Sequence, residues 1–295
     1  GTISVDTRYA DYQDTAILWA NNFTNEVVEI ASKTDSELTL DGTVVGNYPT
    51  GSRVMPSRTA RVLDTVSVVD KTKRYNEIKV IWKAVENYLL TGEDLTQYAG
   101  HDIVEWCTLL SGDGVGREIV RPLEWLDFET GIFRAISRLD YSRFNSTGVK
   151  GVFDSKADIW AYRQWLHKLK GRATPFWLPT FSSDIRITDD FLDTDTVLTI
   201  ERVDYSYIYD SPMFSHLAFV LPDGTIYPRE VVASAIAGEE EIIQIDSALG
   251  FSGGADTFKV ISFLPLVRMA ADRIEINWHR PDLIETSFGV VGVEA

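Results

Sequence analysis

The chain has 295 residues, and its 28 Lys and Arg against 44 Asp and Glu give a formal net charge of −16. With 44% hydrophobic and 12% aromatic residues it is too apolar to be disordered, and its length accommodates about two domains. A single cysteine, Cys107, excludes an intramolecular disulfide framework and a cysteine-cluster metal site. The acidic excess argues against general nucleic-acid binding, which requires a basic surface facing the phosphates.

Short apolar runs separated by turn residues fill the first part of the chain, over 1–90. The expected strands cover residues 17–19, 26–30, 37–40, 43–45, 52–55, 61–69 and 77–82. Asp41-Gly42 is a strong hairpin signal between the third and fourth of these strands. Short strands with frequent turn signals are typical of a sandwich or a barrel, so we expect an N-terminal β domain.

The rest of the chain predicts a β-rich connection over 91–180 and a C-terminal β domain over 181–295. Strands are expected in the connection at 103–107 and 122–128. The strands expected in the C-terminal domain cover 197–200, 218–221, 241–245, 258–264, 273–278 and 283–293.

One convincing helix is expected at the end of the connection, over 154–170. Its apolar residues recur at spacings of three and four and form a single stripe, which Trp160 and Trp165 widen. The residues of the stripe are Ile159, Tyr162, Leu166 and Leu169. Asp154 or Ser155 can cap the N-terminus of this helix, and Gly171 suits the position just past its end. The predicted fold class is therefore mainly β, with two β-sandwich or barrel-like domains joined by a β-rich segment and one prominent amphipathic helix.

No residue set is predicted to be catalytic, to bind a cofactor or to bind a metal. Residues 250–254 match the nucleophile elbow of hydrolases, but no helix follows them. The carboxylates of Asp184, Asp189, Asp190, Asp193 and Asp195 lack the spacing of a calcium loop and predict a solvated acidic loop. The histidines, which show no zinc-binding spacing, are His101, His167, His216 and His279. With so many acidic residues, a carboxylate pair for glycan hydrolysis stays open as a weaker alternative.

Three tyrosines alternate along the chain, at Tyr205, Tyr207 and Tyr209. If this stretch is a strand, the three rings share one face, where exposed aromatic rings can stack on sugars. A carbohydrate-binding β-sandwich module is therefore an alternative function. The same alternation also fits a core face or a subunit interface.

Residues 160–180 read Trp-Ala-Tyr-Arg-Gln-Trp-Leu-His-Lys-Leu-Lys-Gly-Arg-Ala-Thr-Pro-Phe-Trp-Leu-Pro-Thr. An amphipathic helix here ends in Gly-Arg and is followed by an extended Phe-Trp-Leu-Pro segment. This pattern resembles one in tail-tip (distal tail or baseplate) proteins of long-tailed bacteriophages, and the resemblance extends more weakly to 26–56 and 265–278. The residues that carry it are Trp160, Trp165, Gly171, Arg172, Pro175, Phe176, Trp177 and Pro179.

The resemblance implies a structural protein of the virion tail rather than an enzyme, made in the host cytoplasm and needing no cofactor. Such proteins assemble in multiple copies, as a symmetric ring or collar that couples the tail tube to hub and fibre proteins during host attachment. The implied partners are further copies of the chain and other tail proteins, without sequence-specific nucleic acid. Membrane insertion is not expected, because the longest apolar stretch, 213–222, is about half the length of a membrane span.

The net charge adds a condition to this hypothesis. Copies that each carry −16 repel one another, so repeated assembly has to offset that repulsion. We therefore expect subunit interfaces to be apolar or locally charge-paired, with the excess acidic residues facing solvent or a channel.

Overall fold

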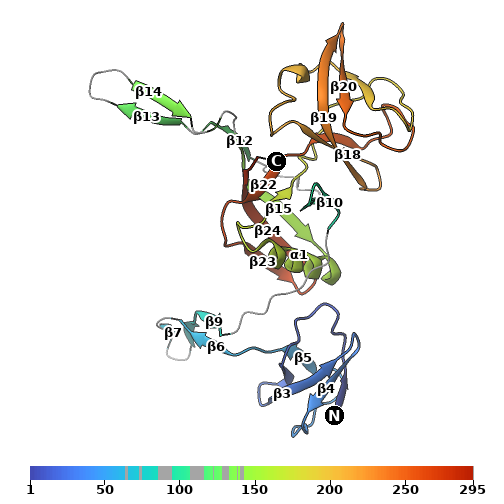
Figure 1. The fold of residues 1–295 in the computed structure, drawn as a ribbon. Coiled ribbons are helices and arrows are strands. Elements are labelled where there is room, and N and C mark those ends of the chain that lie inside the picture. Colours follow the sequence, from blue (N-terminus) through green and yellow to red (C-terminus); the bar gives the residue numbers. More distant parts are fainter. Residues whose placement is uncertain are drawn as a thin grey trace. The chain divides into compact units, whose positions relative to one another are not determined.

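The computed structural model describes residues 1–63, 66–72, 75–85, 95–106, 116–121, 123–127, 133–137, 139 and 143–294. The chain divides into two compact units, Gly1–Leu90 and Thr91–Ala295. It is mainly β with one prominent α-helix and two half-barrel sheets, which confirms the predicted fold class (Figure 1). Among the described helices, none has the length and apolar character that a membrane span requires.

The first unit is built on a five-stranded antiparallel sheet with the order β1-β4-β3-β2-β5. Its strands are β1 (Thr2–Ser4), β2 (Thr15–Asn21), β3 (Thr24–Lys33), β4 (Glu37–Asp41) and β5 (Arg53–Pro56). Strand alternation brings Ala16, Leu18, Leu38 and Leu40 to one face, where they bury each other together with Tyr12.

The strand predicted over 43–45 is wrong. β4 pairs with β1 and β3, and the chain leaves the sheet after Asp41. The Glu26 carboxylate accepts hydrogen bonds from the backbone N–H groups of Val45 and Gly46, at 3.1 and 3.2 Å. Because a side chain satisfies these groups, the segment is held as a loop and needs no partner strand.

Two pairs of short strands follow, and we call the described residues among 57–85 the N-terminal ribbon. Its strands are β6 (Ala60–Val62), β7 (Ser67–Thr72), β8 (Tyr75–Lys79) and β9 (Trp82–Ala84). β7 pairs with β8, and β6 pairs with β9, so the strands predicted over 61–69 and 77–82 are each divided in two. None of its described residues belongs to a buried apolar cluster.

The second unit contains a six-stranded sheet with the order β12-β15-β24-β22-β16, to which β23 adds by pairing with β24. These strands are β12 (Gly116–Val120), β15 (Arg143–Phe153), β16 (Phe176–Trp177), β22 (Leu266–Met269), β23 (Glu275–Arg280) and β24 (Leu283–Gly292). The helix α1 (Lys156–Leu169) packs on this sheet, and both contribute to one apolar core (Figure 1).

A five-stranded sheet of the same unit has the order β17-β20-β19-β18-β21. Its strands are β17 (Val197–Glu201), β18 (His216–Val220), β19 (Ile226–Ala237), β20 (Glu240–Ile245) and β21 (Val260–Phe263). Neither β19 nor β15 is among the predicted strands. Each contains a register shift where it pairs with its neighbour, so hydrophobic alternation is interrupted.

Two short hairpins complete this unit. β10 (Gln97–Tyr98) pairs with β11 (His101–Asp102), and β13 (Leu123–Asp127) pairs with β14 (Phe133–Ser137). The strand predicted over 103–107 is reduced to a single bridge at Ile103, and Cys107 lies outside the described residues. We call the β13–β14 pair the central ribbon, since the described strands give it no third partner (Figure 1).

Candidate functional site

The candidate site is the joint formed by α1 and the extended segment that follows it, residues 154–180. Ser155 caps the helix, because its Oγ accepts the backbone N–H of Asp158 at 3.1 Å. At the other end Lys170 and Gly171 take left-handed conformations with φ of 52° and 67°, which ends the helix. Both helix ends therefore lie where the sequence predicts them.

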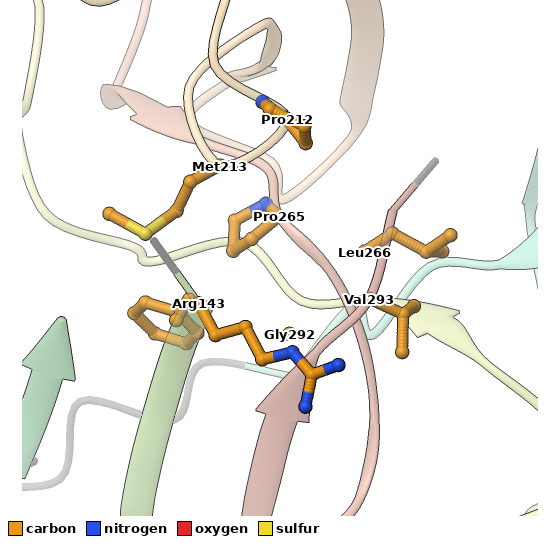
Figure 2. A pocket seen from close by; sticks show the side chains of 8 residues that line it. Arg143, Pro212, Met213, Pro265, Leu266, Gly292 and Val293 are labelled. Atoms are coloured by element: carbon orange, nitrogen blue, oxygen red, sulfur yellow. The ribbon is translucent and has the colours of Figure 1, made fainter. Parts of the chain in front are cut away.

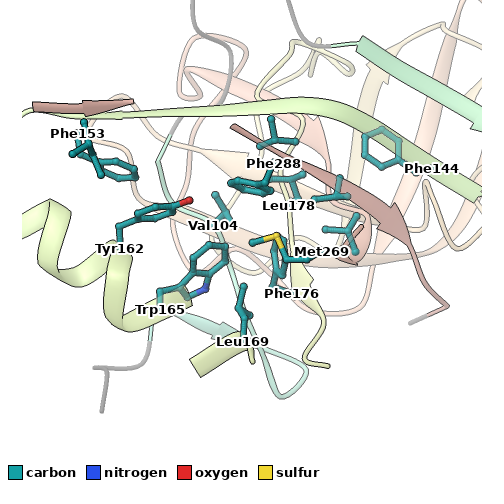
Figure 3. Packing of buried hydrophobic residues seen from close by; sticks show 14 of the residues in the cluster. Val104, Phe144, Phe153, Tyr162, Trp165, Leu169, Phe176, Leu178, Met269 and Phe288 are labelled. Carbon is teal, nitrogen blue, oxygen red and sulfur yellow. The ribbon is translucent and has the colours of Figure 1, made fainter. Parts of the chain in front are cut away.

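Trp165 is the centre of the core beneath the helix (Figure 3). It is only 1% exposed, and its ring meets those of Trp106 and Phe176 edge to face, with centroids 4.9 and 5.1 Å apart. Tyr162, one turn earlier, stacks on Phe153 of β15. Such aromatic packing is sensitive to shape, so it specifies one orientation of α1 on the sheet.

Trp160, the other tryptophan of the helix, lies at the edge of this aromatic core. Its ring is half-buried, and the guanidinium carbon of Arg163 lies 5.4 Å from the ring centroid. This is a surface cation–π contact and not part of the core. The two tryptophans of the helix therefore have different roles.

The Phe-Trp-Leu-Pro segment connects the two large sheets of the second unit. Phe176 and Trp177 pair with β22, and Trp177 accepts a hydrogen bond from the backbone N–H of Val104 on its other side. Further along, Thr180 donates its N–H to the carbonyl of Phe263 in β21. The segment thus continues from the edge of one sheet to the edge of the other.

Trp177 fills the space between these sheets. It is 1% exposed and packs with Ala218 and Val220 of β18, and its Nε1 donates to the carbonyl of Tyr98 at 2.8 Å. Pro175 and Pro179, which lack an N–H, flank the paired residues, so they cost the ladder no hydrogen bond where it forms. The geometry makes the segment a rigid tie between two sheets.

A bidentate ion pair holds the turn after the helix. Nε and Nη2 of Arg172 lie 3.2 and 3.1 Å from the two carboxylate oxygens of Asp272, and the Arg172 backbone N–H donates to the same group. These hydrogen bonds lower the pKa of Asp272 below its ordinary value. Glycine suits position 171 because its φ of 67° is left-handed, and a Cβ there would also lie 2.5 Å from Asp272 Oδ1 and displace this carboxylate.

His216 packs against Trp177 of this segment, a contact that the sequence does not indicate. Its Nδ1 is 3.1 Å from the Tyr98 hydroxyl, and its ring centroid is 4.7 Å from that of Trp177. Burial lowers the pKa of His216 below its ordinary 6.5, although the carboxylates of Glu230 and Asp246 act in the opposite direction. The folded protein therefore favours the neutral imidazole.

We expect stability to fall as the pH drops below about 6.5. The unfolded chain then binds a proton at His216 that the folded chain resists, so the free energy of unfolding decreases until the lowered folded pKa is reached. Above 6.5 the residue is neutral in both states and contributes no pH dependence. Urea titrations at several pH values should show a smaller slope in His216→Gln than in the wild type. An unchanged slope in His216→Gln would contradict the assignment.

The three tyrosines do not form a face. The condition for a shared face, that this stretch is a strand, is not met, because Tyr205–Tyr207 is a turn of 3₁₀ helix. Tyr205 is fully buried, and its hydroxyl donates to the carbonyl of Phe214 at 2.6 Å, whereas Tyr207 is 72% exposed. Tyr209 packs against the edge of the same core. A turn replaces the period of two by roughly three, so alternate residues point in different directions.

Glu241 is a structural residue that no sequence motif indicates. Its side chain is fully buried in β20, where its carboxylate accepts the backbone N–H of Tyr205 at 2.9 Å and the hydroxyl of Ser206. It thereby holds the 3₁₀ turn against the sheet. A glutamate within an alternating strand gives no sequence signal for this role.

The structure also places the elbow-like motif over 250–254 and the acidic loop. Residues 250–254 lie in a loop without a following helix, and the acidic loop is exposed at Asp189, Asp190 and Asp193. In the part of the chain that the structure describes, no three His, Cys, Asp or Glu residues come together as a metal site. Asp184 instead accepts hydrogen bonds from Thr180, Ser182 and the backbone of Phe263.

Two pockets lie near the joint. The one in Figure 2, of about 10 Å³, has room for no more than about one water molecule. It is lined by Arg143, Phe144, Pro212, Met213, Pro265, Leu266, Gly292 and Val293. A neighbouring pocket of about 180 Å³ is mostly apolar. Among the described residues that line it, Asp184 is the one ionisable group, and it already has hydrogen-bond partners.

No protein-family model and no curated protein matches the chain.

Proposed function

We propose that the chain is a structural subunit of a bacteriophage tail tip or baseplate. It acts in multiple copies in the virion and couples the tail tube to hub and fibre proteins during host attachment. It performs no catalysis in this role and takes no cofactor. Its partners are further copies of itself and other tail proteins.

The observation that carries the proposal is the exposed apolar surface of the two ribbons. In the N-terminal ribbon Ile78 and Trp82 are 61% and 64% exposed, and in the central ribbon Trp125 is 65% exposed. Single exposed apolar residues are ordinary, but gathered ones mark surfaces that are covered in an assembly. A two-stranded ribbon is also marginally stable alone, so a partner would stabilise it.

The joint supports an architectural role in particular. It ties two sheets together with buried aromatic side chains and main-chain hydrogen bonds, and the described residues around it form no open cleft lined by reactive groups. A rigid connection of this kind suits a part that transmits force. Residues 160–180 resemble tail-tip proteins, and on this ground we assign the architectural role to the phage tail.

Locating the chain in particles tests the proposal. Virions of the virus that encodes it are purified, the tails are separated from the heads, and both fractions are analysed by quantitative mass spectrometry and antibody labelling. We expect stoichiometric amounts in the tail fraction and labelling at the tail end. A chain that is abundant in the lysate but missing from purified virions would overturn the proposal.

A further inference from the structure

The N-terminal ribbon combines apolar exposure with a local charge opposite to that of the whole chain. Residues 57–85 contain seven Lys and Arg against three Asp and Glu, a net charge of +4. The remainder of the chain therefore carries −20. The net charges of two copies repel each other, but the basic ribbon of one copy attracts the acidic remainder of another.

Within the ribbon, two basic side chains lie directly opposite each other. Arg61 of β6 pairs in register with Lys83 of β9, both are exposed, and neither makes an ion pair with a described residue. On the same face, two residues further along, Leu63 donates its backbone N–H to the carbonyl of Ile81 at 3.0 Å. Like charges facing each other across strands are unfavourable in an isolated ribbon, and an acidic partner would relieve them.

A surface with the converse character lies on the sheet β17-β20-β19. Glu201 pairs in register with Glu240, and neither carboxylate forms an ion pair with a described residue. The outward face beside this pair is formed by small and aliphatic side chains and Gln244. We call this surface the acidic face, and its members are Val197, Thr199, Glu201, Ala233, Ala235, Ala237, Glu240, Ile242 and Gln244.

The acidic face belongs to the most acidic part of the chain. Residues 184–256 contain fifteen Asp and Glu against three Lys and Arg, a net charge of −12. The opposite side of the same sheet is buried, since Leu198, Ile200 and Ile243 belong to the core. The face is therefore a firmly supported surface with an apolar centre and an acidic edge.

We propose that the N-terminal ribbon docks on the acidic face of a second copy of this chain. Arg61 and Lys83 then lie against Glu201 and Glu240. Leu63 and Ile81, which share the face of Arg61 and Lys83 and are 58% and 51% exposed, cover the aliphatic centre. The inference rests on the proposed function for its expectation of repeated copies. It adds the interface through which the copies meet and explains how a chain of net charge −16 associates with itself.

The proposal also determines the type of assembly. Because the two surfaces are different, each copy uses its ribbon toward one neighbour and its acidic face toward another. Such head-to-tail contacts form a closed ring where the rotation closes and a filament where it does not. Each new copy offers both surfaces, so the contact repeats.

Charge-reversal substitutions in the full chain test the inference. Self-association is measured by sedimentation velocity over a wide concentration range. We expect the wild type to form oligomers that salt weakens. Arg61→Glu with Lys83→Glu should weaken association by at least about tenfold, and so should Glu201→Lys with Glu240→Lys, because each brings like charges together. Combining all four substitutions should restore it, since the pairs are again complementary.

Controls separate this contact from net charge and from folding. Lys156→Glu with Lys259→Glu changes the charge by the same amount at exposed positions outside both surfaces, and should leave association unchanged. Circular dichroism and urea unfolding verify that every variant folds. Because restoration requires both exchanged surfaces, a folding defect cannot produce it.

Each contrary result has a distinct meaning. A wild type that stays monomeric, or a fourfold variant that does not associate again, overturns the inference. So does binding of a labelled DNA duplex that Arg61→Glu with Lys83→Glu abolishes while self-association is unchanged. Absence of the chain from purified virions would instead overturn the proposed function, and would leave a measured charge-dependent contact in place.

Discussion

Replacing Trp165 by alanine should lower the free energy of unfolding by about 3–5 kcal/mol, measured by urea titration followed by circular dichroism. The side chain is almost fully buried and contacts Trp106, Phe176 and Phe288. Its loss removes apolar burial and leaves a cavity that rigid aromatic neighbours fill poorly. The same change should broaden the unfolding transition if α1 loses its unique orientation.

Trp160→Ala is the matched control for this prediction. It removes the same side chain from the same helix, but from a half-buried position whose contact is the Arg163 guanidinium. We expect a loss of about 1 kcal/mol or less. Equal losses from the two substitutions would contradict the packing described for the joint.

The second large effect is expected at Tyr205. Tyr205→Ala should cost about 3–5 kcal/mol, because it removes a buried ring stacked on Phe263 and a hydroxyl that donates to the carbonyl of Phe214. Tyr205→Phe should cost about 0.5–1.5 kcal/mol, since it removes the hydrogen bond to that partly buried carbonyl. Urea unfolding at neutral pH measures both.

Tyr207 provides the comparison within the same turn. Tyr207→Ala should change the free energy of unfolding by about 0.5 kcal/mol or less, because the ring is exposed. This contrast also bears on the alternative of sugar binding. If the three tyrosines formed a stacking face, loss of Tyr205 would reduce glycan binding without unfolding the protein, which is the opposite of what burial predicts.

Local sequence patterns were sufficient to predict the elements that depend mainly on neighbouring residues. The helix was predictable from its apolar stripe and from Ser155 and Gly171 at its ends, because capping and amphipathicity are local properties. Strands with clean alternation, such as β4, β17 and β20, were predictable for the same reason. A turn signal alone was not sufficient, since Asp41-Gly42 leads into a loop held by Glu26.

Irregular elements were not predictable, because their conformation depends on residues that are distant in the sequence. β15 and β19 contain register shifts that interrupt alternation, and their identity depends on the strands beside them. Tyr205 and Tyr207 alternate in sequence but follow a turn that the buried carboxylate of Glu241 holds in place. Glu241 lies 36 residues from Tyr205 along the chain, so the sequence around the tyrosines shows only their alternation and not the turn that Glu241 holds.

By itself, the sequence determined that this is a mainly β protein with one amphipathic helix and a net charge of −16. Only the tertiary structure decided that Trp177 ties two sheets together, that Tyr205 is core, and that Arg61 and Lys83 lie side by side. The reason is physical. Composition and periodicity are sums over neighbouring residues, whereas burial and cross-strand pairing join residues that are far apart along the chain.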